Sequence, residues 1–212
     1  MPTTDTYRTL ATPAEGIYKE KGSRFLAFAY PVADTSQVKS HLDQLRKQFF
    51  DARHHCYAYR LGPLGDTFRA VDDGEPSGTG GRPIHGQLLS ADLTDTLIVV
   101  VRYFGGILLG TSHLSAAYRE AARDAIAQAQ IIERTIDRHY LLTFPYESMN
   151  DIMRLLRDLG LKPTTQPTYA DQLCTLPVAI RLSLTDRFLA AASQLRSLQL
   201  TPLPAPSNNP QS

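Results

Sequence analysis

Apolar and polar positions alternate with two different periods near the start of the chain. Between residues 26 and 32 every second residue is apolar, which is the period of a β-strand with one apolar face. Within residues 38–49 the apolar positions are four, three and four residues apart, which is the spacing of an amphipathic helix. Asp34, Thr35 and Ser36 precede this helix, and each can cap a helix N-terminus. The pattern therefore predicts a strand followed by a capped helix.

More strands and helices are predicted up to residue 132. Residues 55–61 and 67–71 have extended character, and residues 84–89 fit a short helix. Residues 97–101 are continuously apolar and rich in β-branched side chains, as in a central strand covered on both faces. After a glycine-rich turn, apolar residues recur at helical spacing over 114–132. This part of the chain is therefore expected to be of the α+β class.

The pattern starts afresh near residue 135. It predicts strands at 140–144, 164–169 and 174–182, and helices at 149–159 and 185–198. Gly160 is expected to end the first of these helices, and Thr185 to cap the second. The resulting β-α-β-β-α order is that of a ferredoxin-like sandwich.

Two domains are the better interpretation of this restart. We expect them to span residues 1–134 and 138–203, with the boundary near residues 133–138. The stretch from Pro202 onwards is polar and rich in proline, and its last residues, 204–212, are expected to form a disordered tail.

Composition and charge narrow the class of protein only slightly. The formal net charge of +1 predicts no basic footprint over the whole chain, and it leaves a local basic patch open. Cys56 and Cys174 lie far apart and have no partners at metal-ligand spacing. The start of the sequence lacks a secretory signal pattern, and its longest apolar run is far below the roughly 20 residues that cross a bilayer. We therefore expect a reduced, cytoplasmic protein with no cofactor, metal or membrane contact.

One loop has a composition that no core strand or helix requires. Residues 72–83 hold three carboxylates, two hydroxyls, four glycines and one arginine. Similarly unusual runs lie upstream at 53–60 and downstream at 102–106. A solvated connector is the alternative interpretation, because most loops connect elements and do nothing else. The presence of three such runs in one predicted domain favours a shared binding site.

The glycine runs and histidines do not match established catalytic motifs. Gly105, four further residues and then Gly110 come close to a P-loop, but Thr111 replaces the lysine that contacts the terminal phosphates. We therefore expect no nucleotide hydrolysis, while anion binding at the helix N-terminus stays open. His54 and His55 are adjacent, so in a strand they point to opposite faces and cannot chelate one ion together.

Nucleophilic catalysis has two nominal candidates. Cys56 follows a histidine but stands among aromatic and apolar residues, which is typical of a small core residue. Ser77 lies near an acid but lacks the G-x-S-x-G elbow. Conventional hydrolase chemistry is therefore not expected.

Arginines and tyrosines in the three runs have the chemistry of nucleic-acid contact. Arginine binds phosphate and tyrosine stacks on bases. The residues concerned are Arg53, Arg60, Arg82, Arg102, Tyr57, Tyr59 and Tyr103. The same tyrosines alternate within predicted strands, so ordinary packing within a sheet is the alternative.

Four ordered motifs resemble those of the IMPACT/YigZ family, in its bacterial YigZ-like branch. They are K-G-S-R-F at 21–25, H-H-C-Y-A-Y-R at 54–60, D-D-G-E-P-S-G-T at 72–79 and V-R-Y-F-G-G at 101–106. The resemblance implies a first domain with a left-handed β-α-β fold, similar to domain IV of elongation factor G. It also implies a ferredoxin-like second domain and a role connected with translation.

Two positions depart from the family pattern. Leu108 stands where the family usually has lysine, and Ala116 stands where it usually has arginine. Two positive charges near the glycine turn are therefore missing, which weakens the case for an anion at that end of the domain.

Together these observations predict a non-catalytic, translation-associated regulatory protein that binds RNA or the ribosome. The expected binding residues are Arg53, His54, His55, Tyr59, Arg60, Asp72, Asp73, Glu75, Ser77, Gly78, Arg82, Arg102, Tyr103, Gly105 and Gly106. The acids Asp72, Asp73 and Glu75 are expected to order the loop by pairing with arginines or by accepting backbone N–H bonds. The alternatives are a metal-dependent hydrolase that uses these three acids, and an adaptor that binds a protein partner through its second domain.

Overall fold

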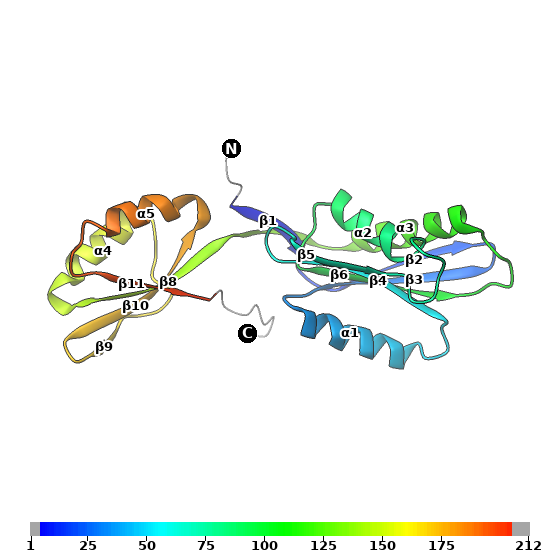
Figure 1. Cartoon of the computed structure of the whole chain (residues 1–212), viewed down its shortest axis with the longest axis horizontal. Helices are drawn as coiled ribbons and strands as arrows, with labels where there is room; N and C mark the ends of the chain where they lie inside the picture. Colours follow the sequence, from blue (N-terminus) through cyan, green and yellow to red (C-terminus); the bar gives the residue numbers. More distant parts are fainter. Residues whose placement is uncertain (1–4, 205–212) are drawn as a thin grey trace. The chain divides into compact units, whose positions relative to one another are not determined.

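The structure, a computed structural model, describes residues 5–204, which divide into two compact units (Figure 1). One unit spans Tyr7–Arg134, and the other comprises residues 135–204 together with Asp5 and Thr6. No described helix is long and apolar enough to cross a membrane.

Asp5 belongs with residues that lie far along the chain. The backbone N–H of Ile136 donates to the carbonyl oxygen of Asp5 over 2.7 Å. The Ser183 hydroxyl also donates to the Asp5 carboxylate. The second unit is therefore assembled from two separate pieces of sequence.

A five-stranded antiparallel sheet forms the centre of the first unit. Its strands, in spatial order, are β2 (Ala14–Glu20), β3 (Ser23–Pro31), β6 (Thr96–Tyr103), β4 (His54–Leu61) and β5 (Thr67–Val71). One face is covered by α1 and the other by α2 and α3 (Figure 1). The helices are α1 (Thr35–Gln48), α2 (Gly81–Ser90) and α3 (Thr111–Gln128). A separate two-stranded sheet joins β1 (Thr6–Leu10) to β7 (Ile131–Thr135).

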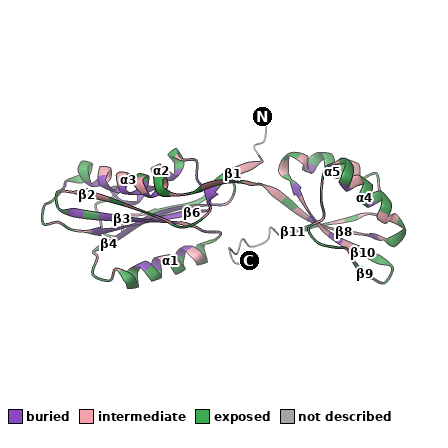
Figure 2. Ribbon diagram, turned by 180° about the vertical axis from the view of Figure 1, so that it is seen from behind, coloured by how far each residue is buried: buried purple, intermediate pink, exposed green. Residues whose placement is uncertain are grey.

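Both faces of the central strands are buried, as the purple segments of Figure 2 show. Ile98 and Val100 of β6 pack under α2 and α3, and Val99 and Val101 pack under α1. The prediction of a central strand covered on both faces is therefore confirmed. Strand β3 also buries both faces, including Phe25, which goes beyond the one apolar face that its alternation indicates.

Helix α1 begins where its capping residues predict. The Asp34 carboxylate accepts hydrogen bonds from the backbone N–H groups of Ser36 and Gln37, over 2.8 and 2.9 Å. These bonds satisfy two of the donors that a helix N-terminus leaves unpaired.

The second unit is a four-stranded antiparallel sheet with two helices on one face (Figure 1). The spatial order of its strands is β11 (Gln199–Leu203), β8 (Asp137–Pro145), β10 (Leu173–Arg181) and β9 (Thr168–Ala170). Helices α4 (Met149–Asp158) and α5 (Thr185–Ala192) supply the apolar side chains that pack on the sheet. The α+β class and the ferredoxin-like order are therefore confirmed.

The end of this unit differs from the prediction in two ways. Pro202 and Leu203, which lie in the polar, proline-rich stretch, belong to β11 and pair with β8, which adds a final strand to the predicted order. Residues 205–212 of the expected tail lie outside the described residues. Thr185 is the first residue of α5, not its cap, and its hydroxyl donates to the carbonyl of Arg181.

Candidate functional site

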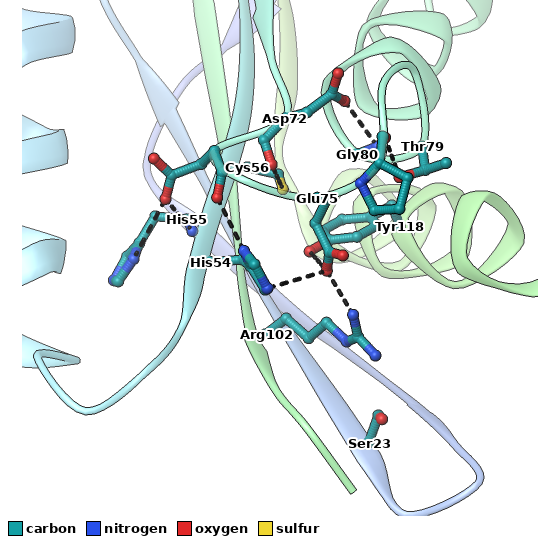
Figure 3. Close-up of polar contacts among 12 residues, drawn as sticks. Ser23, His54, His55, Cys56, Asp72, Glu75, Thr79, Gly80, Arg102 and Tyr118 are labelled. Carbon is teal, nitrogen blue, oxygen red and sulfur yellow. Dashed lines mark hydrogen bonds and ion pairs between the residues drawn. The ribbon is translucent and has the colours of Figure 1, made fainter. Parts of the chain in front are cut away.

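The motif runs meet at one end of the five-stranded sheet. Antiparallel register places Arg102 of β6 between Phe25 of β3 and His54 of β4. The loop of residues 72–80 follows β5 and folds over this end, so that Glu75 reaches Arg102 (Figure 3). Segments that are far apart in sequence therefore form one cluster.

Asp72 organises the loop through its carboxylate. One oxygen accepts the N–H of Gly78 over 2.8 Å, and the other accepts those of Gly80 and Gly81 over 2.9 and 2.8 Å. Partial burial by itself would raise the pKa of Asp72, but these three donors outweigh it and hold that pKa below its ordinary value. The carboxylate thus closes the turn and satisfies donors at the start of α2.

Asp73 ties the loop to the start of β4. Its carboxylate accepts the backbone N–H of His55 over 2.7 Å and lies 3.3 Å from the Arg46 guanidinium. The His54 ring nitrogen Nδ1 lies 2.9 Å from the Asp73 carbonyl oxygen. The expectation that the acids order the loop agrees with this geometry.

Glu75 forms a buried ion pair with Arg102. The two side chains are 4% and 8% exposed, and Arg102 Nη1 donates to the carboxylate over 2.6 Å. The Tyr118 hydroxyl of α3 donates to the same oxygen over 2.8 Å, and His54 Nε2 lies 3.9 Å away. This group joins the loop to β4, β6 and α3 (Figure 3).

The turn at Gly22 and the turn at Gly105 pack directly against each other at the same end of the sheet. A Cβ atom at Gly105 would lie 2.0 Å from the carbonyl carbon of Gly22 and 2.2 Å from the nitrogen of Ser23. The Gly105 N–H donates to the buried Ser23 hydroxyl over 3.1 Å. The glycines of the K-G-S-R-F and F-G-G motifs therefore allow one backbone to pack on another.

Cys56 and His55 are buried beside the loop. The Cys56 thiol donates to the carbonyl of Asp72 over 2.8 Å, and burial raises its pKa well above the ordinary value, so it is no thiolate nucleophile. Burial lowers the pKa of His55, which favours a neutral ring. The ring of His54 lies on the other face of β4 (Figure 3), as expected for adjacent strand residues.

The carboxylates of the loop are occupied by protein donors. Within residues 5–204 no three His, Cys, Asp or Glu side chains are grouped so that they could hold a metal ion. The metal-dependent alternative therefore has no ligand set among the described residues.

Three expected contact residues are placed differently from the prediction. Tyr59 is buried in the cluster under α1. Arg60 donates to the carbonyl of Leu93 over 2.9 Å and supports the chain locally. Arg102 is nine-tenths buried and neutralised by Glu75. None of the three side chains is free to contact a phosphate or a base, because Tyr59 is packed in the core and the two arginines are bonded to other groups of the protein.

Other expected residues do lie at the surface. Arg53, Ser77, Arg82 and Gly106 are exposed, and Gly78 is half-buried in the loop. Tyr103 is half-buried, and its hydroxyl donates to Asp51.

Exposed aromatic side chains at this end were not part of the sequence prediction. Phe50 is 83% exposed and Phe104 is 47% exposed. They flank Asp51 and Tyr103, which are joined by a hydrogen bond of 2.8 Å, so both belong to the same end of the sheet. The guanidinium of Arg24 lies 5.0 Å from the Tyr103 ring centre. The sequence does hold a hint of the exposed Phe50. Phe49 completes the apolar stripe of the predicted helix, so the adjacent Phe50 has no place on that buried face.

The Asp72 contacts predict a dependence of stability on pH. A carboxyl whose pKa is depressed in the folded state stabilises above its unfolded pKa of about 4 and loses that contribution as the pH falls through its folded value. Replacing Asp72 with asparagine should cost about 2 kcal/mol of unfolding free energy at neutral pH. The difference from wild type should shrink below pH 4 in urea unfolding followed by circular dichroism.

The matched control for this prediction is Asp66→Asn. Asp66 is exposed, and its side chain has no hydrogen bond to any described residue, so the change should alter stability little. A difference between Asp72→Asn and wild type that stays constant down to pH 2 would contradict the role assigned to the carboxylate.

Comparisons with known proteins agree with this fold and these motifs. The model of the Impact N-terminal domain family matches residues 21–126. The IMPACT family member YigZ of Escherichia coli K12 is 35% identical over 148 residues, which cover 69% of this chain and 72% of the relative. The family member YvyE of Bacillus subtilis is 35% identical over 136 residues, covering 64% of this chain and 63% of the relative.

A solved structure extends the similarity to both units. A crystal structure described only as that of a hypothetical protein has a TM-score of 0.68 and 31% sequence identity. The alignment covers 95% of this chain and 98% of that one. These matches, together with the four motifs at the sheet end, show that the chain belongs to the IMPACT family.

Proposed function

We propose that this chain is a non-catalytic, translation-associated regulatory protein that binds RNA, free or in the ribosome, at the motif end of its five-stranded sheet. The observation that carries the proposal is the combination of exposed cations and exposed aromatic rings at that end. Cations bind phosphates and aromatic rings stack on bases, so the combination suits RNA.

The cations come from several segments of the first unit. Lys47 lies in the last turn of α1 and Arg53 just before β4, while Lys21 and Arg24 lie at the β2–β3 turn and Arg82 at the start of α2. All five are exposed. Within the described residues Arg53 and Arg82 form no ion pair. Their charges are therefore available to phosphates.

The aromatic side chains supply the second requirement. Phe50 and Phe104 are large and exposed, and a solvent-facing ring of this kind gains energy when a base covers it. The guanidinium of the ion-paired Arg102 lies over the Phe104 ring, 5.7 Å from its centre, and this cation–π contact helps to orient the ring. In this proposal Arg102, Glu75 and Asp72 position the surface, and other residues touch the RNA.

The chemistry of the cluster favours binding over catalysis. Asp72 and Glu75 accept hydrogen bonds from three backbone N–H groups and two side chains, and Cys56 is a buried thiol. The implied similarity of the first domain to domain IV of an elongation factor supports the link with translation.

The proposal is tested with Arg53→Ala/Arg82→Ala. Binding of a fluorescent single-stranded RNA is measured by polarisation over a range of salt concentrations, and co-sedimentation with ribosomes is measured in parallel. Loss of two phosphate contacts should weaken binding and reduce the slope of log K against log salt by about 1.4.

The control variant removes two positive charges from exposed positions outside the proposed site. Arg119→Ala/Arg157→Ala removes two exposed arginines, one on α3 and one on α4, and should bind like wild type. If wild type binds neither RNA nor ribosomes at low salt, or if both double variants weaken binding equally, the proposed site is wrong.

A further inference from the structure

The two edge strands of the five-stranded sheet are treated differently. At β2 the backbone N–H of Ile17 donates to the Asp124 carboxylate of α3 over 2.8 Å. Gly16 lies so close to α3 that a Cβ atom there would be 2.2 Å from the nitrogen of Ala125. A helix therefore covers this edge and satisfies one of its donors, which is a common protection against pairing with another chain.

The edges of the four-stranded sheet are protected by simpler means. Strand β11 contains Pro202, which has no N–H to offer a further strand. Strand β9 is only three residues long. Of the four edges of the two larger sheets in residues 5–204, three therefore carry a feature that discourages strand addition.

Strand β5, the fourth of these edges, also meets a helix at its end, where a Cβ atom at Gly81 of α2 would lie 2.3 Å from the nitrogen of Val71. Among the described residues, however, no side-chain acceptor covers its backbone N–H groups as Asp124 covers that of Ile17. It runs without a bulge beside β4, from Thr67 opposite Leu61 to Val71 opposite Tyr57. It contains no proline or lysine, and all its residues except Val71 are exposed. No described strand pairs with its outer side. Its outward backbone groups are therefore open to another strand.

Exposed apolar side chains lie on this edge and in the elements beside it. Phe68 is 60% exposed although its ring stacks on that of His85 in α2, with ring centres 4.8 Å apart. Leu64, in the turn before β5, and Leu89 of α2 are also exposed. A strand added at β5 would cover part of this surface, which gives the pairing a hydrophobic contribution beyond its backbone hydrogen bonds.

We propose that β5 pairs in antiparallel fashion with β5 of a second copy of this chain, about a two-fold axis at Phe68. The two five-stranded sheets then form one continuous sheet. In an antiparallel pair, two residues that lie opposite each other either both point their N–H and C=O groups at the partner strand or both point them away. These directions alternate along a strand, so in a symmetric pair the two residue numbers must add up to an even number. The axis at Phe68 meets this condition and places Phe68 opposite its symmetry mate, Arg69 opposite Thr67, and Ala70 opposite Asp66.

Self-pairing suits this edge better than pairing with a charged segment. The edge region carries one acid, Asp66, and one base, Arg69, so it is neutral and attracts neither an acidic nor a basic peptide. The axis at Phe68 puts no like charges directly opposite each other, and it creates an aromatic pair, which is a favourable cross-strand combination. A two-fold axis also closes the assembly at two copies.

The first test is sedimentation equilibrium of the full chain at several concentrations. Wild type should form dimers with a dissociation constant of about 10–100 μM, as suits a small interface. Phe68→Lys should weaken dimerisation at least about tenfold, because a charge would replace the central aromatic pair. Ile17→Lys introduces the same charge at an exposed apolar residue of the protected β2 edge, and this variant should dimerise like wild type.

A cross-linking experiment tests the register. Phe68→Cys should form a disulfide-linked dimer under mild oxidation, because residues opposite each other in a strand pair come close enough for a disulfide. Ile17→Cys and wild type should not, since Cys56 and Cys174 are buried. The inference is overturned if wild type stays monomeric at every concentration, if Phe68→Lys dimerises as wild type does, or if Phe68→Cys does not cross-link. It does not depend on RNA binding.

Discussion

Replacing Glu75 with alanine is expected to lower the free energy of unfolding by about 3–5 kcal/mol. The change would leave the Arg102 guanidinium buried without its counter-ion and the Tyr118 hydroxyl without its acceptor. It would also release the loop of residues 72–80 from β6 and α3. Urea unfolding followed by circular dichroism measures the loss, and the midpoint should fall while the m-value stays similar.

Two further variants separate pairing from general damage. Glu120→Ala breaks a surface pair with Arg123 on α3 and should cost less than about 1 kcal/mol. Glu75→Gln/Arg102→Met leaves no buried charge and should recover much of the stability lost in Glu75→Ala. A loss below 1 kcal/mol in Glu75→Ala would show that the pair contributes little to the fold.

Replacing Gly105 with alanine is expected to destabilise the first unit by about 3 kcal/mol. The added methyl group would overlap the backbone of Gly22 and Ser23, and backbone atoms cannot rotate away as the end of a side chain can. The hydrogen bond from the Gly105 N–H to the Ser23 hydroxyl would be disturbed as well. Thermal unfolding should show a clear fall in the midpoint temperature.

Gly86→Ala is the matched control for this substitution. Gly86 lies inside α2, and a Cβ atom there would have no neighbour within 4 Å. Alanine is the better helix former, so this change should stabilise by about 0.5–1 kcal/mol. Equal effects at the two glycines would contradict the account of the Gly105 contact.

The fold was largely predictable because its signals are local. The capping residue Asp34, the apolar run 97–101 and the alternation in β10 each depend on neighbours within a few residues. Strand β11 escaped prediction because it is short and contains Pro202, which is usual only in an edge strand. The edge position is a tertiary fact that local patterns do not contain.

The candidate site was predictable in its location and less so in its roles. Composition marked the loop of residues 72–80, and the acids do order it. Whether an arginine is free or paired depends on what lies opposite it in space, so Arg102 and Arg60 could not be told from Arg53 in the sequence. The exposed Phe50 and Phe104 were missed for the same reason, because exposure is decided by what packs above a residue.

The attachment of Asp5 to the second unit has a consequence for the order of events during synthesis. Asp5 leaves the ribosome long before Ile136, so it finds this hydrogen-bond partner only after Ile136 has emerged. All strands of the five-stranded sheet are synthesised between Asp5 and Ile136, so the core of the first unit can fold before Asp5 has its partner. A fragment that begins at residue 138 would lack both Asp5 and Ile136. A fragment designed to fold as the second unit should therefore include the segment around Asp5 as well as Ile136.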